Sequence, residues 1–95
     1  MLYLVHMQVN IPASTDPGFI ERLMADEKAY SHKLQAEGKW RHLWRVTGQF
    51  ANYSVFDVAS HDELHTLLSS LPLHPFMTSV EVTPLAHHPS AIAQN

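Results

Sequence analysis

The 95-residue chain contains no cysteine, so it can have no disulfide framework, thiolate nucleophile or thiolate metal ligand. Basic residues are also few, since six Lys and Arg stand against nine Asp and Glu and give a formal net charge of −3. The chain therefore lacks the electrostatic footprint of a nucleic-acid-binding protein. No apolar run approaches the length of a membrane span, and the N-terminal residues do not resemble a signal peptide. We expect a soluble, cytoplasmic protein that binds neither nucleic acid nor membrane.

What the chain has in quantity is apolar side chains, which make up 45% of its residues. That share is typical of a packed globular protein. A chain of this length forms one small domain with a limited interior. Such a domain, if it holds a substrate pocket, commonly relies on partner subunits to complete it. We therefore expect a single domain over residues 1–95 that associates with copies of itself.

The order of the predicted elements is β-α-β-β-α-β. Alternating apolar residues predict strands, and apolar residues every three or four positions predict helices. The strands are predicted at Leu2–Asn10, Trp40–Val46, Ala51–Val58 and Thr78–Leu85, and the helices at Phe19–Glu37 and from a Ser60 cap through a leucine stripe that ends at Leu71. This order is that of the ferredoxin-like α+β sandwich, in which two helices cover one face of an antiparallel four-stranded sheet. The apolar residues of the other face predict a covering partner.

The first predicted helix carries a carboxylate in an unexpected place. At about 100° per residue, Glu27 lies within roughly 20° of Ile20 and Leu34, near the centre of the apolar stripe. Burying an unpaired carboxylate is costly and raises its pKa, and a carboxylate with a raised pKa is a good general base near neutral pH. The alternative is structural: a neighbouring Arg or His pairs with Glu27, or the side chain lies at the edge of the helix.

The two middle strands carry candidate substrate-binding residues. If Val46 lies opposite Ala51, strand alternation divides the side chains between the two faces of the hairpin. One face then carries His42, Trp44, Tyr53 and Val55, and the other carries Arg41, Arg45, Asn52 and Ser54.

Three of these side chains suit a substrate carboxylate. Arg41 and Arg45 could clamp one with two hydrogen bonds, although arginines on strands are commonly ordinary surface residues. His42 alternates with Trp40 and Trp44 on a strand that we expect to be central. It could bind a carboxylate or orient a base, or it could be a half-buried histidine bonded to a backbone carbonyl. The tryptophans themselves suit a core or a subunit interface.

The eight histidines do not form a convincing metal site. His61 and His65 stand four apart on the second predicted helix, but no HExxH pattern accompanies them and both lie on the solvent side of its leucine stripe. His87 and His88 are adjacent, which is an awkward geometry for ligating one ion. No glycine-rich phosphate loop or serine nucleophile motif is present either. We expect no metal and no cofactor.

Six segments of the chain, taken in order, resemble the muconolactone isomerase family of aromatic catabolism. They are PxxxDP at Pro12–Pro17, ADEK at Ala25–Lys28, EGKWRHLWR at Glu37–Arg45, ANYSVFDV at Ala51–Val58, LPL at Leu71–Leu73 and HHPS at His87–Ser90. The resemblance implies a ferredoxin-like fold and large rings, typically decamers, with active sites shared between subunits. It also implies that the ADEK glutamate, Glu27, is a catalytic base that takes a proton from a lactone ring and returns it to another carbon without a cofactor.

The loop after the second helix departs from the family pattern. Family isomerases usually carry LPLFPYM, whereas this chain carries LPLHPFM, with His74 and Phe76 at the two aromatic places. The change favours the chloromuconolactone dehalogenase variant, in which Glu27 takes a proton and chloride leaves from the adjacent carbon to give a dienelactone. The alternative is the muconolactone delta-isomerase itself, which forms 3-oxoadipate enol-lactone. The full set of candidate substrate-binding residues is His42, Trp44, Tyr53, Arg41, Asn52, Ser54, His74 and Phe76.

Functions of another class also suit the fold. A ferredoxin-like binding module, or a monooxygenase of the same barrel architecture, would not need Glu27, so Glu27→Ala would leave its ligand affinity or oxygen-dependent turnover intact. The segment from Leu85 to Asn95 is too polar and irregular to fold alone. We expect this tail to pack on a neighbouring subunit, where it would close that subunit's pocket.

Overall fold

The structure is a computed structural model that describes residues 1–92 of the chain. Its elements follow the predicted order, with one short 3-10 helix added before the last strand. The strands are β1 (Leu2–Val9), β2 (Trp40–Arg45), β3 (Ala51–Asp57) and β4 (Met77–Leu85), and the helices are α1 (Pro17–Ala36), α2 (His61–Ser69) and the 3-10 helix η1 (His74–Phe76). The predicted bounds are confirmed to within one or two residues.

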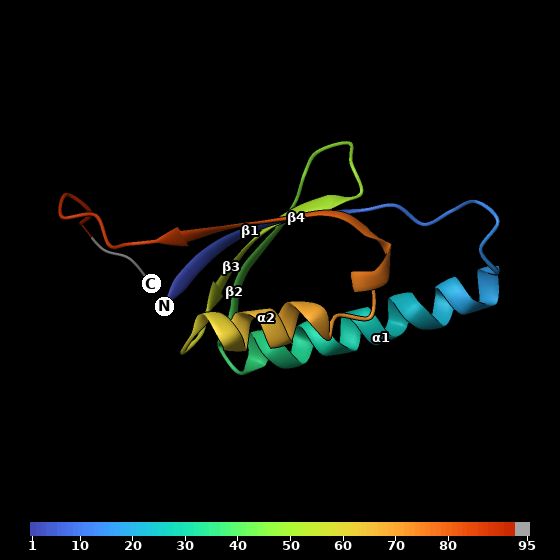
Figure 1. Cartoon of the computed structure of the whole chain (residues 1–95), viewed down its shortest axis with the longest axis horizontal. Helices are drawn as coiled ribbons and strands as arrows, with labels where there is room; N and C mark the ends of the chain where they lie inside the picture. Colours follow the sequence, from blue (N-terminus) through green and yellow to red (C-terminus); the bar gives the residue numbers. More distant parts are fainter. Residues whose placement is uncertain (93–95) are drawn as a thin grey trace.

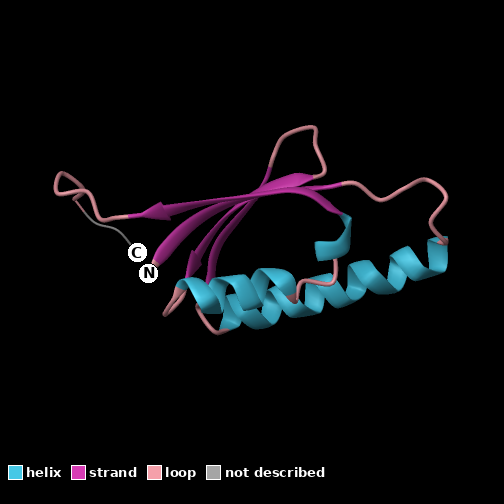
Figure 2. Ribbon diagram, viewed as in Figure 1, coloured by secondary structure: helices cyan, strands magenta, loops and turns pink. Residues whose placement is uncertain are grey.

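Both helices lie on one face of a four-stranded antiparallel sheet (Figures 1 and 2). The strand order is β2-β3-β1-β4, so β1 and β3 are central and the other two strands form the edges. This is the predicted ferredoxin-like α+β sandwich. One expectation is wrong: the strand that carries His42, β2, is an edge strand and not a central one.

Local signals explain where the helices begin and end. The Asp16 carboxylate caps α1 by accepting the Phe19 N–H at 2.9 Å, and Pro17 occupies the first helical position. Gly38 follows the helix with a φ of +78°, a conformation that costs glycine little. Ser60 caps α2 in the same way, because its Oγ accepts the Glu63 N–H at 3.0 Å.

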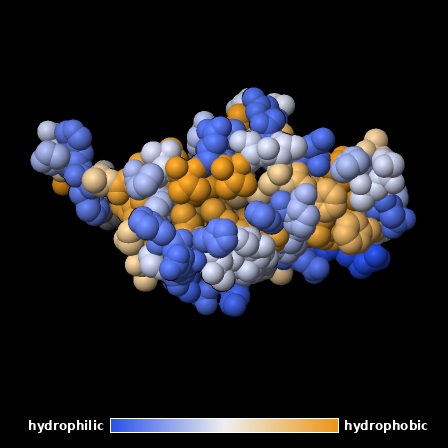
Figure 3. Space-filling view, in the orientation of Figure 1, coloured by the Kyte–Doolittle hydropathy of each residue, from blue (hydrophilic) through white to orange (hydrophobic). Residues whose placement is uncertain are grey.

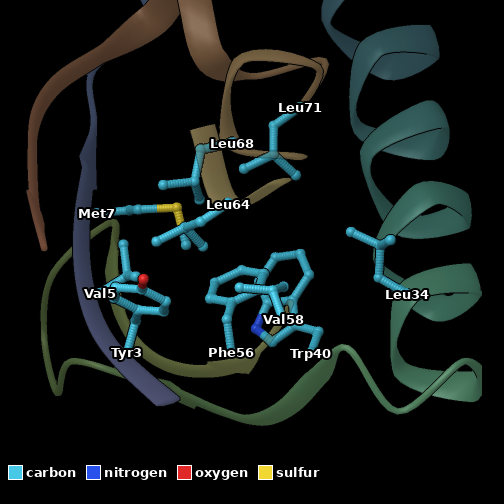
Figure 4. Close-up of a cluster of buried hydrophobic side chains, with 10 residues drawn as sticks. All are labelled: Tyr3, Val5, Met7, Leu34, Trp40, Phe56, Val58, Leu64, Leu68 and Leu71. Carbon is cyan, nitrogen blue, oxygen red and sulfur yellow. The ribbon is translucent and has the colours of Figure 1, made fainter. Parts of the chain in front are cut away.

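The core fills the space between the sheet and the two helices (Figure 4). It consists of ten buried side chains: Tyr3, Val5, Met7, Leu34, Trp40, Phe56, Val58, Leu64, Leu68 and Leu71. The rings of Trp40 and Phe56 lie 4.8 Å apart at its centre. The N-terminal half of α1 extends beyond the sheet (Figure 1), and Phe19 and Met24 there are partly exposed.

An apolar groove lies at the edge of the sheet, where β4 passes α2. Val82 and Pro84 of β4 and Leu64 and Leu68 of α2 contribute to its walls. Figure 3 shows apolar side chains gathered between these two elements on the face turned to the viewer.

No helix within residues 1–92 is long and apolar enough to cross a membrane.

A β-bulge in β2 determines which of its residues face the helices. Trp40 lies opposite Phe56, and His42 lies opposite the next residue, Val55, so Arg41 is the extra residue. Strand alternation predicts that Arg41 shares a face with Arg45, and this prediction is wrong because the bulge interrupts the alternation. The Arg41 guanidinium instead lies 3.3 Å from the Asp57 carboxylate.

Beyond the bulge the predicted register is confirmed. The Val46 N–H donates to the Ala51 carbonyl at 2.9 Å, and Trp44 lies opposite Tyr53. The predicted faces therefore hold for the remaining residues. His42, Trp44, Tyr53 and Val55 share the open face of the sheet, and Arg45, Asn52 and Ser54 share the face toward the helices.

The open face of the sheet carries stacked and exposed rings. Trp44, Tyr53, His6 and Glu81 form one row across the four strands. The rings of His6 and Tyr53 lie 4.6 Å apart, and His42 stacks on Trp44 at 5.2 Å. Trp44 is 55% exposed and Tyr53 is 44% exposed. This agrees with the prediction that the helices leave apolar residues of this face uncovered.

The segment after β4 has no regular structure of its own. Residues 86–92 run away from the body of the domain (Figure 1), and the Ile92 side chain is fully exposed. Packing of this tail on a neighbouring subunit stays a prediction, and its last three residues lie outside the described residues.

Candidate active site

Glu27 lines a cleft between α1, the sheet and the loop that follows α2. The cleft has a volume of about 280 Å³, near the lower end of the range for small-molecule sites. Most of its lining is apolar, with Met7, Met24, Leu73 and Met77 among its walls. Charged, amide and hydroxyl side chains line it at Glu27, Ser31, Arg45 and Asn52, and the indole of Trp40 lines it as well.

The helix directs Glu27 inward because this residue shares a stripe with Ile20 and Leu34. The stripe is confirmed, since Leu34 is buried and Glu27 is half-buried despite its charge. One carboxylate oxygen, Oε1, accepts the Leu73 backbone N–H at 2.8 Å. Within residues 1–92, no Arg, Lys or His forms an ion pair with Glu27. In this part of the chain, Glu27 is therefore not the ion-paired structural carboxylate of the alternative interpretation.

The surroundings of Glu27 change its acidity. Burial raises the pKa of the Glu27 carboxyl, and the hydrogen bond from Leu73 offsets that rise only in part. Since Leu73 is its sole hydrogen-bond donor in the described part of the chain, Oε2 has no partner there. A carboxylate with a raised pKa, one oxygen held and the other unengaged, is equipped to accept a proton from a bound carbon acid.

The β2–β3 hairpin contributes the other polar groups of the cleft. Arg45 lies directly opposite Asn52, and its guanidinium lies 5.5 Å from the centre of the Phe50 ring. The Asn52 Oδ1 accepts a hydrogen bond of 2.7 Å from the hydroxyl of the fully buried Ser54. The hairpin thus places a cation and an amide in the same cleft as the carboxylate.

The structure brings only part of the predicted set together. Glu27 and Asn52 line one cleft, and Ser54, which does not line it, donates a hydrogen bond to Asn52. The other hairpin candidates, His42, Trp44 and Tyr53, lie on the opposite face of the sheet. Arg41, which pairs with Asp57 at the bulge, does not line the cleft either. His42 is also exposed rather than half-buried, because an edge strand leaves it uncovered.

The two residues of the altered loop also lie outside the cleft. His74 is exposed on η1, and the ring of Phe76 lies 6.4 Å from that of Phe19. Their neighbour Leu73 lines the cleft, but neither of them does so. Within one subunit, the departure from the family loop therefore does not alter the walls around Glu27.

The positions of some groups in the cleft can be predicted from the sequence, and those of others cannot. Strand alternation places Arg45 on the same face as Asn52, but it does not distinguish Arg45 from Arg41 and His42 as the carboxylate ligand. Phe50 lies in the turn, where no periodicity predicts its direction. The Leu73 donor is a backbone group, and its approach to Glu27 depends on how α2 packs against α1.

Comparisons with known proteins give matches over nearly the whole chain. A family model described as muconolactone delta-isomerase matches residues 1–91. A muconolactone delta-isomerase of Cupriavidus pinatubonensis is 60% identical over 92 residues, which cover 97% of this chain and 99% of that relative. A muconolactone delta-isomerase of Rhodococcus opacus is 48% identical over 91 residues, covering 96% of this chain and 97% of the relative.

Solved structures show the same fold. A crystal structure of a muconolactone isomerase matches with a TM-score of 0.93 at 50% identity, covering 100% of this chain and 98% of that one. A 5-chloro-2-hydroxyhydroquinone dehydrochlorinase of Burkholderia phenoliruptrix, in complex with 2,5-dihydroxybenzoquinone, matches with a TM-score of 0.66 at 21% identity, covering 93% of this chain and 96% of that one. At that identity the second likeness shows the fold alone.

Proposed function

Because this chain belongs to the muconolactone delta-isomerase family, we propose that it isomerises muconolactone with Glu27 as the single acid–base group. The observation that carries the proposal is Glu27 itself, a half-buried carboxylate in a mainly apolar cleft with one oxygen unengaged in the described chain. The matching relatives at 48% and 60% identity are named as muconolactone delta-isomerases, which supports the same substrate here.

The isomerase is better supported than the dehalogenase that the altered loop suggested. The relatives of high identity carry the isomerase name, whereas the dehydrochlorinase is 21% identical and shares only the fold. His74 and Phe76, on which the dehalogenase interpretation rested, do not line the cleft of Glu27.

The proposed reaction moves one proton and one double bond. Muconolactone is an unsaturated five-membered lactone with a carboxymethyl arm. Glu27 takes the proton from the ring carbon that bears the arm, and the electron pair delocalises through the double bond into the lactone carbonyl. The protonated Glu27 then returns the proton to the carbon beside that carbonyl, which gives the enol-lactone. The raised pKa of Glu27 favours the first step, because it makes the carboxylate a stronger base that can hold the proton until it is returned.

The test compares two substrates on the purified protein. We expect efficient turnover of muconolactone, little chloride release from 5-chloromuconolactone, and a loss of about 10³-fold or more in Glu27→Ala. Fast chloride release with poor muconolactone turnover would establish a dehalogenase instead. Turnover that survives in Glu27→Ala would contradict the mechanism under either name and would favour a function that does not need this carboxylate.

We also propose that the chain forms a homo-oligomer, with a decamer expected from the family resemblance, through the open face of the sheet. Its exposed Trp44 and Tyr53 support this, as does the small size of the domain. In such an assembly the tail after Leu85 would reach a neighbouring cleft. Truncation after Leu85 should then reduce turnover or the mass measured by light scattering. If both stay unchanged, the tail does not close a neighbouring cleft. The cytoplasmic location stays a prediction.

A further inference from the structure

The cleft of Glu27 contains a positive charge whose position can be traced strand by strand. Arg45 of β2 lies opposite Asn52 of β3, which lies opposite Met7 of β1. Since directly opposed residues project to the same side of a sheet, these side chains form one row on the face toward the helices. All three line the cleft, and among the lining residues that the structure describes Arg45 is the one cation.

The hairpin holds this cation and the neighbouring amide in defined positions. The Arg45 guanidinium lies over Phe50, 5.5 Å from the ring centre, in a cation–π arrangement. The Oδ1 of Asn52 is engaged by the Ser54 hydroxyl at 2.7 Å, so the amide NH₂ is the group that Asn52 can offer to a ligand. A guanidinium beside an amide donor is a suitable pair for an anionic carboxylate.

The other two carboxylate ligands weighed from the sequence are placed differently. The Arg41 guanidinium is occupied by Asp57 at 3.3 Å, and His42 stacks on Trp44 on the open face of the sheet. Neither shares the cleft of Glu27. Arg45 alone of the three lies on the same side of the sheet as the base.

We propose that Arg45, assisted by Asn52, binds the carboxylate of the substrate's carboxymethyl arm and thereby sets which ring carbon faces Glu27. The inference rests on the proposed isomerase function and adds a rule of substrate choice to it. The enzyme accepts lactones whose ring bears an anionic arm and discriminates against those whose arm is neutral, because a neutral arm leaves the guanidinium unpaired.

The experiment compares muconolactone with its primary amide, in which the arm has lost its charge. In Arg45→Gln, we expect kcat/KM for the acid to fall about 10- to 100-fold, mainly through KM, while kcat/KM for the amide changes little. Arg45→Lys keeps the charge and should recover part of the preference for the acid. Arg22→Gln removes the same charge from an exposed position of α1 and should behave as the wild type.

A second variant keeps the test decisive if Arg45→Gln folds poorly. Asn52→Asp retains an acceptor for Ser54 but places a negative charge beside the arm, so it should reduce turnover of the acid far more than turnover of the amide. Equal losses for both substrates in these variants would overturn the inference. A preference lost in Arg41→Gln but kept in Arg45→Gln would overturn it as well. Wild-type protein that fails to convert muconolactone would instead contradict the proposed function.

Discussion

Glu27 occupies a position of α1 that helical spacing assigns to the core, and its environment accounts for its chemistry. A leucine there would pack on the sheet at no electrostatic cost, whereas the carboxylate loses hydration and has one backbone N–H in return. Burial consequently raises the pKa of Glu27. The same loss of hydration makes the carboxylate both a stronger base and a liability for stability.

The pH dependence of turnover should report this raised pKa. Only the deprotonated Glu27 can take a proton, so kcat/KM for muconolactone should fall as the pH decreases through the pKa of Glu27. Because burial raises that pKa, the midpoint should lie above the usual value for a glutamate. A pH–rate profile measures it, and a midpoint at or below that of an exposed glutamate would contradict the assigned role.

Removing the charge of Glu27 should not destabilise the fold at neutral pH. The folded pKa lies above the unfolded one, so the charged form is penalised at a pH above the folded pKa, and the penalty disappears as the pH falls below the unfolded value. Glu27→Gln keeps an acceptor for the Leu73 N–H. We expect its melting temperature at neutral pH to equal or exceed that of the wild type, with a difference that shrinks on acidification.

The matched control for this measurement is Glu21→Gln, which changes an exposed glutamate of the same helix. Its melting temperature should stay close to that of the wild type at both pH values. A marked loss of stability at neutral pH in Glu27→Gln, but not in the control, would show that the charged form of Glu27 stabilises the fold.

At the scale of the elements, β2 shows where pattern-based prediction succeeds and fails. Its existence, its bounds and the register of its last residues follow from alternation and from the glycine turn after it. The bulge at Arg41 does not follow from the sequence, because the residue types of the strand do not indicate where an extra residue is inserted. The insertion nevertheless moves the preceding residue, Trp40, to the other face of the sheet. Trp40 thereby joins the core while Trp44 remains exposed.

The start of α2 provides a test at this scale. The Ser60 hydroxyl accepts the Glu63 N–H, and the Glu63 carboxylate in turn accepts the Ala59 N–H at 2.9 Å. Ser60→Ala should therefore lower the free energy of unfolding by about 1 kcal/mol, measured by urea denaturation. Ser69→Ala is the control, because its hydroxyl bonds the His65 carbonyl within the same helix and contributes little. Equal effects of the two substitutions would mean that the cap does not determine the start of the helix.

Glu63 also links this helix start to pH. The hydrogen bond from the Ala59 N–H is the main cause that lowers the pKa of Glu63. A lowered folded pKa means that the contribution of the carboxylate is present above the unfolded pKa and is lost as the pH falls through the folded one. Acidification therefore removes a stabilising contribution of Glu63 but relieves a destabilising contribution of Glu27.

At the scale of the whole molecule, the two faces of the sheet have different roles. The face toward the helices holds the core and the cleft, whereas the open face presents the exposed rings of Trp44 and Tyr53, with His6 stacked on Tyr53. A monomer that exposes such a patch is prone to associate through it. Because Trp44 and Tyr53 do not line the cleft, a substitution on the open face leaves the side chains around Glu27 in place.

Tyr53→Glu tests the role of the open face. A charge in the middle of the aromatic row should oppose burial of that row against another copy, so the mass measured by light scattering should fall toward that of a single chain. Thr66→Glu adds the same charge to an exposed position of α2 and should leave the mass unchanged. If both variants keep the wild-type mass, the copies associate through another surface or not at all.

The sequence by itself determined the order of the elements, the ferredoxin-like fold and the inward direction of Glu27. These follow from periodicity and capping, which depend on residues close together in the chain. The tertiary structure decided which groups meet Glu27. Leu73 donates to it from 46 positions away, and the bulge separates Arg41 from Arg45. Such contacts depend on how distant segments pack against one another, and no local pattern records that packing.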